Sequence, residues 1–313
     1  MKFKKPKFWD YEKPNFFSYF LLPISFLLLI LNYFRAVTVR RTEKLSIKTI
    51  CVGNIYLGGT GKTPLTIKIY EILKQLNIKV ATVKKNYPNQ KDEQLLLEQK
   101  TSLIISEKRK DAIYQGINKN YDVLVFDDGL QDIRTDFDIK LVCFKSKNWV
   151  GNGHLIPAGP LREKISSLNR FDAVFLNGVL GNFEKIENQI KSINLDIKIF
   201  KTFYKILNIQ KYNLSSKYLI FSGIGNPSDF REILFENKFD VAKEMIFPDH
   251  YEYGHKDFEK IINNAKKANL IILTTEKDYM KVPERFRKEI KFLLIDLVIQ
   301  NESELVKLLK KII

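Results

Sequence analysis

A glycine-rich segment, GNIYLGGTGKTP at residues 53–64, has the residue types and spacing that bind nucleotide phosphates. Glycines let backbone N–H groups turn toward phosphate oxygens, a lysine neutralises the β- and γ-phosphates, and a threonine hydroxyl reaches Mg²⁺. A helix that follows such a loop adds the positive end of its dipole. One position departs from the general G-x-x-x-x-G-K-[ST] pattern, because Tyr56 stands where that pattern has glycine. The predicted nucleotide-binding residues are Gly58, Gly59, Thr60, Gly61, Lys62, Thr63 and Pro64.

Two adjacent acids, Asp127 and Asp128, directly follow the apolar run DVLVF at residues 122–126. A phosphate loop needs a carboxylate at the end of a neighbouring strand to organise its metal ion. Two acids at a strand end are often only a turn, but the upstream loop favours Mg²⁺ binding here. Neighbouring side chains of an extended chain point in opposite directions, so the sequence leaves open which acid faces the metal.

Strands alternate with helical patterns along most of the chain. β-rich runs and one helical pattern (64–76) predict βαβ units in a parallel sheet; the runs lie at 46–52, 79–83, 122–126, 140–144 and 173–176. Ligands bind beyond the carboxyl ends of such strands, where the glycine loop and the two acids fall. A further α/β pattern follows an alternating segment, with strands at 218–221 and 270–274, a helix from Ser228 and a Lys-rich C-terminal helix.

We therefore predict an α/β fold with a P-loop NTPase-like parallel-sheet lobe, a second, smaller α/β lobe and an N-terminal membrane-associated helix. The predicted boundaries are 1–41 for the anchor helix and its basic flanks, 42–196 for the P-loop lobe, 197–213 for a strand linker and 214–313 for the smaller lobe.

Residues 16–34, FFSYFLLPISFLLLILNYF, are uncharged, and basic residues stand on both sides of them. About 20 apolar residues cross the ~30 Å hydrocarbon core of a membrane, so this segment is at the borderline. A cleaved signal peptide is one alternative, but its small-residue cleavage site is missing. A buried core helix is a second alternative. Two observations argue against it: Pro23, Ser18, Ser25 and Asn32 interrupt the apolar run, and aromatic residues are concentrated at both ends, as at membrane interfaces. We predict a spanning or interfacial anchor, with the rest of the chain cytoplasmic.

The chain is strongly basic, with 52 Lys and Arg against 36 Asp and Glu and a net charge of +16. This surplus favours a polyanionic partner, namely nucleic acid, anionic lipid or a phosphorylated substrate, although a general preference for lysine explains it as well. Cys51 and Cys143 lie in apolar runs without metal-ligand spacing, which argues against zinc or disulfides and indicates a reducing compartment.

A phosphate loop alone does not name a reaction. Membrane-associated partitioning ATPases share the GGxGKT core but carry a signature lysine where this chain has Leu57. A GTPase needs an Asn-Lys-x-Asp-type guanine reader, which Thr275–Asp278 echoes only in part. A small-molecule kinase remains, with a membrane-tethered ATPase that acts as a switch or recruitment module as the alternative. Nucleic-acid binding has no recognisable reader motif, and oligomeric state is open.

Six separated segments resemble, in the right order, the tetraacyldisaccharide 4′-kinases of lipid A biosynthesis. They are GNIYLGGTGKTP (53–64), KDEQLLL (91–97), DDGLQD (127–132), GNGHLIPAGPLRE (151–163), FSGIGNP (221–227) with FPDH (247–250), and LTTEKD (273–278). The resemblance covers nearly the whole chain. It implies transfer of the ATP γ-phosphoryl group, with Mg²⁺, to the 4′-hydroxyl of a tetraacylated glucosamine disaccharide 1-phosphate. It also implies a monotopic enzyme at the cytoplasmic face of the inner membrane.

The resemblance assigns roles to individual residues. It implies that Asp92 and His250 together form the general base that accepts the proton of the sugar hydroxyl. Glu93 matches a further site position. On the residues alone, Asp92 could equally be a helix N-cap and His250 a structural histidine. The predicted catalytic residues are Asp92, His250, Lys62 and Arg162, and the predicted metal ligands are Thr63, Asp127, Asp128 and Glu163.

Two places depart from the family pattern. Residues 84–89, KKNYPN, stand where the family has a Gly-Tyr-Gly stretch, and Asp132 stands where the family has histidine. Neither departure touches the phosphate loop.

Overall fold

The computed structural model describes residues 5–38, 46–87, 91–132, 134–178 and 183–313. It divides the chain into two compact units. The first unit contains residues 1–86, 100–203 and 299–313, and the second contains residues 87–99 and 204–298.

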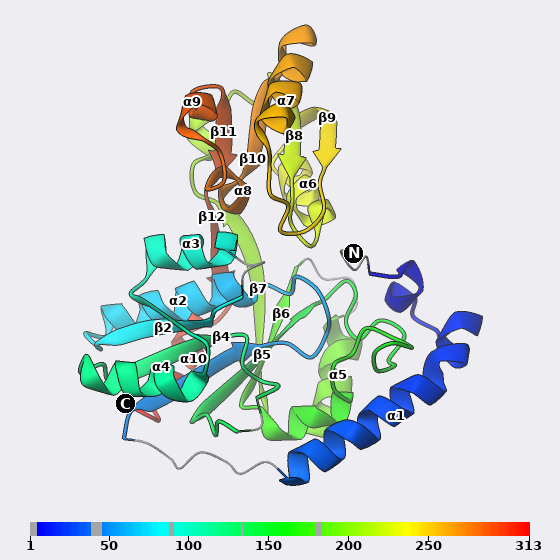
Figure 1. Ribbon diagram of the computed structural model, residues 1–313, viewed down its shortest axis with the longest axis vertical. Coiled ribbons are helices and arrows are strands. Elements are labelled where there is room, and N and C mark those ends of the chain that lie inside the picture. The colour runs from blue at the N-terminus through cyan, green and yellow to red at the C-terminus, as the bar shows by residue number, and fades with distance from the viewer. Residues whose placement is uncertain (1–4, 39–45, 88–90, 133, 179–182) are drawn as a thin grey trace. The chain divides into compact units, whose positions relative to one another are not determined.

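The first unit is built on an eight-stranded sheet (Figure 1) with the order β12-β7-β6-β5-β1-β4-β2-β3. All neighbouring strands from β7 to β3 in this order run parallel. The strands are β1 (Lys48–Gly53), β2 (Val80–Lys85), β3 (Leu103–Ser106), β4 (Val123–Asp127), β5 (Ile139–Lys145), β6 (Ala173–Asn177), β7 (Lys198–Ile206) and β12 (Ile295–Ile299). Every residue of β4 and β6 is buried, as expected for central strands covered on both faces.

The helices of the first unit follow the predicted alternation. They are η1 (Lys7–Asp10), α1 (Phe16–Thr38), α2 (Lys62–Gln75), α4 (Arg109–Asn118), η3 (Ile165–Arg170), α5 (Phe183–Ile193) and α10 (Glu302–Leu309). Helix α2 buries Leu65, Ile69, Ile72 and Leu73, which the 3.6-residue period places on one face. Its first residue is Lys62, so the helix begins at the glycine loop, as predicted.

The second unit has a four-stranded, fully parallel sheet with the order β11-β10-β8-β9. Its elements are α3 (Lys91–Lys100), η4 (Ile209–Lys211), β8 (Lys217–Ser222), α6 (Pro227–Glu236), β9 (Asp240–Ile246), α7 (His255–Lys267), β10 (Ile271–Thr275), α8 (Glu276–Tyr279), α9 (Glu284–Arg287) and β11 (Ile290–Leu293). Alternate residues of β8 enter different core clusters: Leu219 packs with Phe258 of α7, whereas Ile220 packs with Phe230 of α6. The two helices therefore cover opposite faces of this sheet.

These observations confirm the predicted fold class, but the two compact units divide the chain differently from the predicted boundaries. Residues 87–99, which carry Asp92, belong to the second unit, and residues 299–313 belong to the first. In the C-terminal segment α10 buries Leu305, Leu308 and Leu309, and Glu302 at its start pairs with Lys68 of α2 (3.3 Å). The chain passes between the units on either side of residues 87–99, within β7 and within β12.

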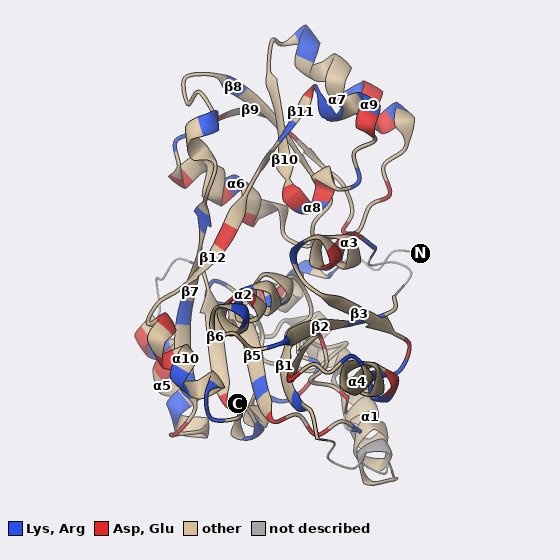
Figure 2. Ribbon diagram, turned by 90° about the vertical axis from the view of Figure 1, so that its left-hand side faces the viewer, with Lys and Arg blue, Asp and Glu red and all other residues tan. Residues whose placement is uncertain are grey.

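Helix α1 turns Ser18 and Ser25 toward the protein and many of its large apolar side chains outward. Ser18 and Ser25 are buried, whereas large apolar side chains such as Phe20, Leu27 and Leu31 are more than half exposed. Asn152 Nδ2 donates to Ser18 Oγ (2.9 Å), and Ser25 Oγ donates to the Leu155 carbonyl (2.9 Å). Most of α1 is uncharged and is drawn tan in Figure 2.

Among the described residues, one helix segment, Phe16–Phe34, is long and apolar enough to cross a membrane, with a mean hydropathy of 1.9. By length and composition alone, a core helix or a signal sequence passes the same test. Only 11% of this segment is buried, however, which is unlike a core helix.

Candidate active site

The glycine loop joins β1 to α2, and two of its glycines adopt backbone conformations that other residues rarely adopt. Gly58 has φ of 139° and Gly61 has φ of 91°. The side-chain amide of Asn54 donates to the carbonyls of Tyr56 (2.6 Å) and Gly58 (3.1 Å), which fixes the first half of the loop. Thr60 Oγ1 is buried and has no hydrogen-bond partner among the described residues. Such a polar group fits a loop that binds an anion.

The side chain of Tyr56 explains how the loop tolerates a residue other than glycine at that position. Its ring is buried, and its hydroxyl donates to the carboxylate of Asp10 in η1. Tyr56 also forms an isolated antiparallel bridge with Leu161, and the N–H of Leu57 donates to the Pro160 carbonyl (2.8 Å). The segment at 151–163 therefore braces the glycine loop along its backbone.

The two adjacent acids have different neighbours, which the sequence could not decide. Asp127 Oδ2 accepts a hydrogen bond from Thr63 Oγ1 (3.0 Å). The carboxylate of Asp128 lies between two cations instead, with Oδ2 4.0 Å from Lys62 Nζ and Oδ1 3.3 Å from Arg162 Nη1. Asp127 is thus next to the predicted metal-binding hydroxyl, and Asp128 is next to the predicted phosphate-binding cations.

These residues fit a nucleotide with Mg²⁺. No group of three or more His, Cys, Asp or Glu side chains that could hold a metal ion occurs among the residues that the structure describes. Mg²⁺ does not need one, because it is usually held by one or two carboxylates, water and substrate phosphates. Thr63 and Asp127 supply oxygen donors of that kind beside the phosphate loop.

Arg162 and Glu163 extend the site toward η3. Arg162 Nη1 also donates to Gln131 Oε1 (3.1 Å), and Gln131 Nε2 donates to Glu163 Oε1 (3.2 Å). Glu163 is further paired with Arg170. The described contacts of Glu163 are therefore with Gln131 and Arg170 rather than with Thr63 or Asp127, and its role as a metal ligand stays a prediction.

A groove of about 1050 Å³ opens beside these residues in the first unit. Apolar side chains of α1 such as Leu28 and Leu29 line it, together with Leu155 and Leu161. Its charged lining residues are Arg162, Glu163, Lys164 and Arg170. An apolar groove that ends at phosphate-binding cations suits an amphiphilic phosphorylated ligand.

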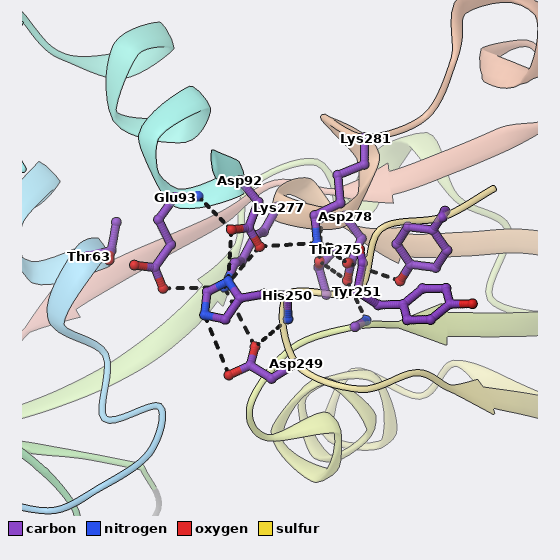
Figure 3. A network of polar contacts seen from close by, with 12 residues as sticks. Thr63, Asp92, Glu93, Asp249, His250, Tyr251, Thr275, Lys277, Asp278 and Lys281 are labelled. Atoms are coloured by element: carbon purple, nitrogen blue, oxygen red, sulfur yellow. Dashed lines mark hydrogen bonds and ion pairs between the residues drawn. The ribbon is translucent and has the colours of Figure 1, made fainter. Parts of the chain in front are cut away.

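The second unit brings together Asp92 at the start of α3 and His250, which are 158 residues apart in the sequence. His250 Nδ1 lies 2.8 Å from Asp92 Oδ1. Two lysines also face this carboxylate (Figure 3), with Lys277 Nζ 3.2 Å and Lys281 Nζ 3.1 Å from Asp92 Oδ2. Lys277 additionally pairs with Glu93 (3.3 Å).

The charges around Asp92 determine its protonation. Burial alone would raise the pKa of Asp92, but the hydrogen bond from His250 and the charges of Lys277 and Lys281 outweigh it and hold the pKa well below its usual range. Asp92 is therefore an anion at neutral pH. The short contact to Nδ1 assigns the N–H of the imidazole to that nitrogen, because a carboxylate can only accept.

The backbone at His250 is held in an uncommon conformation. His250 has φ of 55°, and its N–H donates to the Gly223 carbonyl (3.1 Å). A Cβ on Gly223 would lie 2.8 Å from Tyr253 Oη and 3.3 Å from Asp278 Oδ1, so glycine is required for the close approach. Buried Asp278 accepts from the N–H of Gly223 (2.9 Å), which ties this turn to α8.

We expect Asp92→Asn to lower the melting temperature at pH 7 by roughly 5–10 °C, because it leaves two lysines facing a neutral amide. A carboxylate whose pKa is depressed by folding stabilises the protein above its unfolded pKa, and this stabilisation is lost as pH falls through the folded pKa. The difference in melting temperature between Asp92→Asn and wild type should therefore be constant between pH 7 and pH 5 and should become smaller below about pH 4. Thermal unfolding across this range measures it. A difference that grows toward acid would contradict the assigned charge.

Comparison with known proteins gives a single answer. The family model of LpxK, described as tetraacyldisaccharide-1-P 4′-kinase, matches residues 17–313. A tetraacyldisaccharide 4′-kinase of Pelagibacter ubique is 47% identical over 312 residues, covering 100% of this chain and 99% of the relative. The chain belongs to the tetraacyldisaccharide 4′-kinase family. A second relative of that name, from Rickettsia canadensis, is 34% identical and covers 97% of this chain and 95% of its own length.

The fold agrees with the family. A crystal structure of LpxK from Aquifex aeolicus in complex with ATP matches with a TM-score of 0.72 and 25% identity, and covers 94% of this chain and 99% of that chain. The predicted family and enzyme class, a kinase, are confirmed, and the P-loop fold is that of a relative which binds ATP.

The histidine that the tetraacyldisaccharide 4′-kinase pattern has after its Asp-Asp-Gly-x-Gln is replaced here by Asp132, which pairs with an arginine. Arg109 Nη1 lies 2.8 Å from Asp132 Oδ2, and Nη2 donates to the backbone carbonyl of Asp128 (2.6 Å). Asp128 has φ of 64°, so this contact helps to hold a strained backbone next to Lys62. Sequence analysis assigned no role to Arg109.

The lysines facing Asp92 were also missed. Lys277 belongs to the LTTEKD segment that carries the resemblance, and Lys281 follows it four residues later. Side chains four residues apart on a helical turn lie on the same side of it. This spacing was the signal in the sequence that could have indicated that both lysines face one site.

Proposed function

We propose that this protein transfers the γ-phosphoryl group of ATP to the 4′-hydroxyl of a tetraacylated glucosamine disaccharide 1-phosphate at the cytoplasmic face of the inner membrane. The observation that carries the proposal is the family match over residues 17–313, because it covers the phosphate loop and the second unit together. An ATPase that acts only as a switch needs no proton acceptor, so the Asp92–His250 pair favours the kinase.

On the phosphate side, the glycine loop and Lys62 bind the triphosphate, and Arg162 adds a second cation for the transferred group. Mg²⁺, when bound, would neutralise phosphate charge that develops during transfer. Thr63 and Asp127 would hold it, since their oxygens already lie 3.0 Å apart. Asp128 contacts both Lys62 and Arg162, so it holds the two cations near each other.

On the acceptor side, His250 takes the proton of the attacking hydroxyl. With Nδ1–H donated to Asp92, the other ring nitrogen, Nε2, keeps a lone pair for that proton. Asp92 itself is too strongly stabilised as an anion to be a good acceptor, and it orients the imidazole and stabilises the imidazolium that forms. Lys277 and Lys281 keep it charged throughout.

The lipid side of the proposal rests on α1 and on the groove beside it. The outward apolar residues of α1 suit an acyl-chain environment, while Ser18 and Ser25 fasten the helix to the protein. A helix that is docked along its polar side lies in the membrane surface more readily than it crosses the membrane. The groove would receive apolar parts of the substrate, with Arg162 and Arg170 near its phosphate or sugar.

The test supplies purified protein in detergent with Mg²⁺, the tetraacylated disaccharide 1-phosphate and ATP radiolabelled at the γ-phosphorus. Label should appear in the lipid and should not appear when the 4′-hydroxyl of the acceptor is replaced by hydrogen. Label found solely as free phosphate would refute the kinase and favour the membrane-tethered ATPase.

A triple substitution of Phe20, Leu27 and Leu31 to Asp should weaken binding to vesicles by at least about a hundredfold, because each buried apolar side chain contributes roughly 1.5–3 kcal/mol. All three side chains point outward from α1. Vesicle flotation measures the loss, and nucleotide affinity should be unchanged. Unaltered flotation would show that α1 is not the membrane-binding element.

A further inference from the structure

A buried lysine, Lys84 on β2, lies against the carboxylate to which the proposed function assigns Mg²⁺. Lys84 Nζ is 2.7 Å from Asp127 Oδ2, and the two side chains are 2% and 0% exposed. The pairing of β2 with β4 places the two residues directly opposite each other. Lys84 lies in the segment where the chain departs from the family pattern, and neither the phosphate loop nor the family motifs assign it a role.

The oxygen that Lys84 contacts is the one that faces the metal-binding hydroxyl. Thr63 Oγ1 lies 3.0 Å from the same Asp127 Oδ2. The second oxygen of Asp127 is 3.5 Å from Thr66 Oγ1, so the carboxylate is oriented on both sides. A cation held by Thr63 and Asp127 must therefore share this carboxylate with the ammonium of Lys84.

We propose that Lys84 is a built-in counter-ion of the magnesium site, which neutralises Asp127 and aims it at Thr63 when no metal is bound. An isolated buried carboxylate is strongly destabilising, and an ammonium in contact with it removes that penalty. Once Mg²⁺ binds, the two cations repel each other at short range. Lys84 thereby stabilises the metal-free protein and lowers the affinity for Mg²⁺.

This inference rests on the proposed function for the identity of the metal site, but its first test needs no metal. With metal chelated, Lys84→Met and Asp127→Asn should each lower the melting temperature by roughly 5–10 °C, since each removes one charge of the buried ion pair and leaves the opposite charge in place. The Lys84→Met/Asp127→Asn double variant should be more stable than either single variant. If the melting temperature of the double variant fell by the sum of the losses in the two single variants, the pairing of Lys84 with Asp127 would be overturned.

The second test titrates Mg²⁺ at saturating AMP-PNP, a non-hydrolysable ATP analogue, and follows the melting temperature. For Lys84→Met the Mg²⁺ concentration at half-maximal stabilisation should fall at least about tenfold, because a positive charge beside the metal is removed. Lys85→Met, on the next residue of β2 and the opposite face, is the matched control and should behave as wild type.

The outcomes separate the counter-ion role of Lys84 from the proposed function. A purely structural ion pair predicts the same loss of stability at every Mg²⁺ concentration, and that result would overturn the counter-ion. A wild-type protein that does not respond to Mg²⁺ and nucleotide would instead overturn the proposed function. If Lys84→Met does not fold, comparison of Asp127→Asn with the double variant still decides, because an ammonium that has lost the Asp127 charge destabilises the protein and its removal must raise stability.

Discussion

Lys62→Ala is expected to lower transfer of the γ-phosphoryl group to the disaccharide lipid about a thousandfold, the effect of losing one preorganised charge at a transferring phosphate. Lys62 is the first residue of α2, and Asp128 already holds its ammonium over the glycine loop at 4.0 Å. The radiolabel assay with lipid extraction measures the loss. Nucleotide affinity should fall as well, because Lys62 contacts the phosphates in the ground state.

The matched control is Lys74→Ala, which removes an exposed lysine from the last turn of the same helix. Its activity should stay within twofold of wild type, and the melting temperatures of the two variants should be similar. Transfer at the wild-type rate by folded Lys62→Ala would refute the assignment of the phosphate loop.

His250→Ala should lower the rate of transfer by about 10² to 10⁴, the usual contribution of a general base. Affinity for Mg·ATP should be unchanged, because the proposed role of His250 is to accept the proton of the sugar hydroxyl and not to bind the nucleotide. A loss in turnover with unchanged nucleotide affinity distinguishes a proton acceptor from a nucleotide-binding residue. Single-turnover kinetics with saturating nucleotide measures the chemical step directly.

His255→Ala is the control for this substitution, since His255 is exposed at the start of α7 and contacts Arg285 rather than Asp92. Its transfer rate should match wild type. If His250→Ala and His255→Ala lose activity equally, or if neither does, the proton acceptor is a different group.

Much of the fold could be predicted from local patterns. Buried parallel strands appear in a sequence as short apolar runs. The predicted ends of β4 and β6 were therefore within one residue of the observed ends. The edge strands β3, β9, β11 and β12 were not predicted. Strand β9 is mostly exposed or half-buried, so it carries no continuous apolar signal.

The phosphate loop could be predicted because its chemistry is contiguous in the sequence, whereas the acceptor side could not. Asp92 and His250 come together because residues 87–99 belong to the second unit, although the chain on either side of them belongs to the first. Their pairing was inferred from family resemblance alone. The different surroundings of Asp127 and Asp128 depend on the left-handed backbone at Asp128, which could not be predicted from the residue type.

The departures from the general phosphate-loop pattern and from the family pattern have local explanations that only the three-dimensional structure shows. Tyr56 is accommodated because its side chain leaves the loop toward Asp10, and Asp132 is paired with Arg109. Lys84 is another example, since a lysine at the end of a strand gives no sign in the sequence that it is buried against an acid.

The way α1 is fastened limits how a water-soluble form of this enzyme can be made. The hydroxyls of Ser18 and Ser25 accept hydrogen bonds from the Asn152 amide and from the Ala158 N–H (3.1 Å), both of which are buried. Truncating the helix would leave these donors without their acceptors in the segment that carries Arg162, and would therefore disturb the proposed active site. Replacing only the outward-facing apolar side chains reduces the exposed apolar surface of α1 and keeps those hydroxyls, so we expect it to be the better route to crystals grown without detergent.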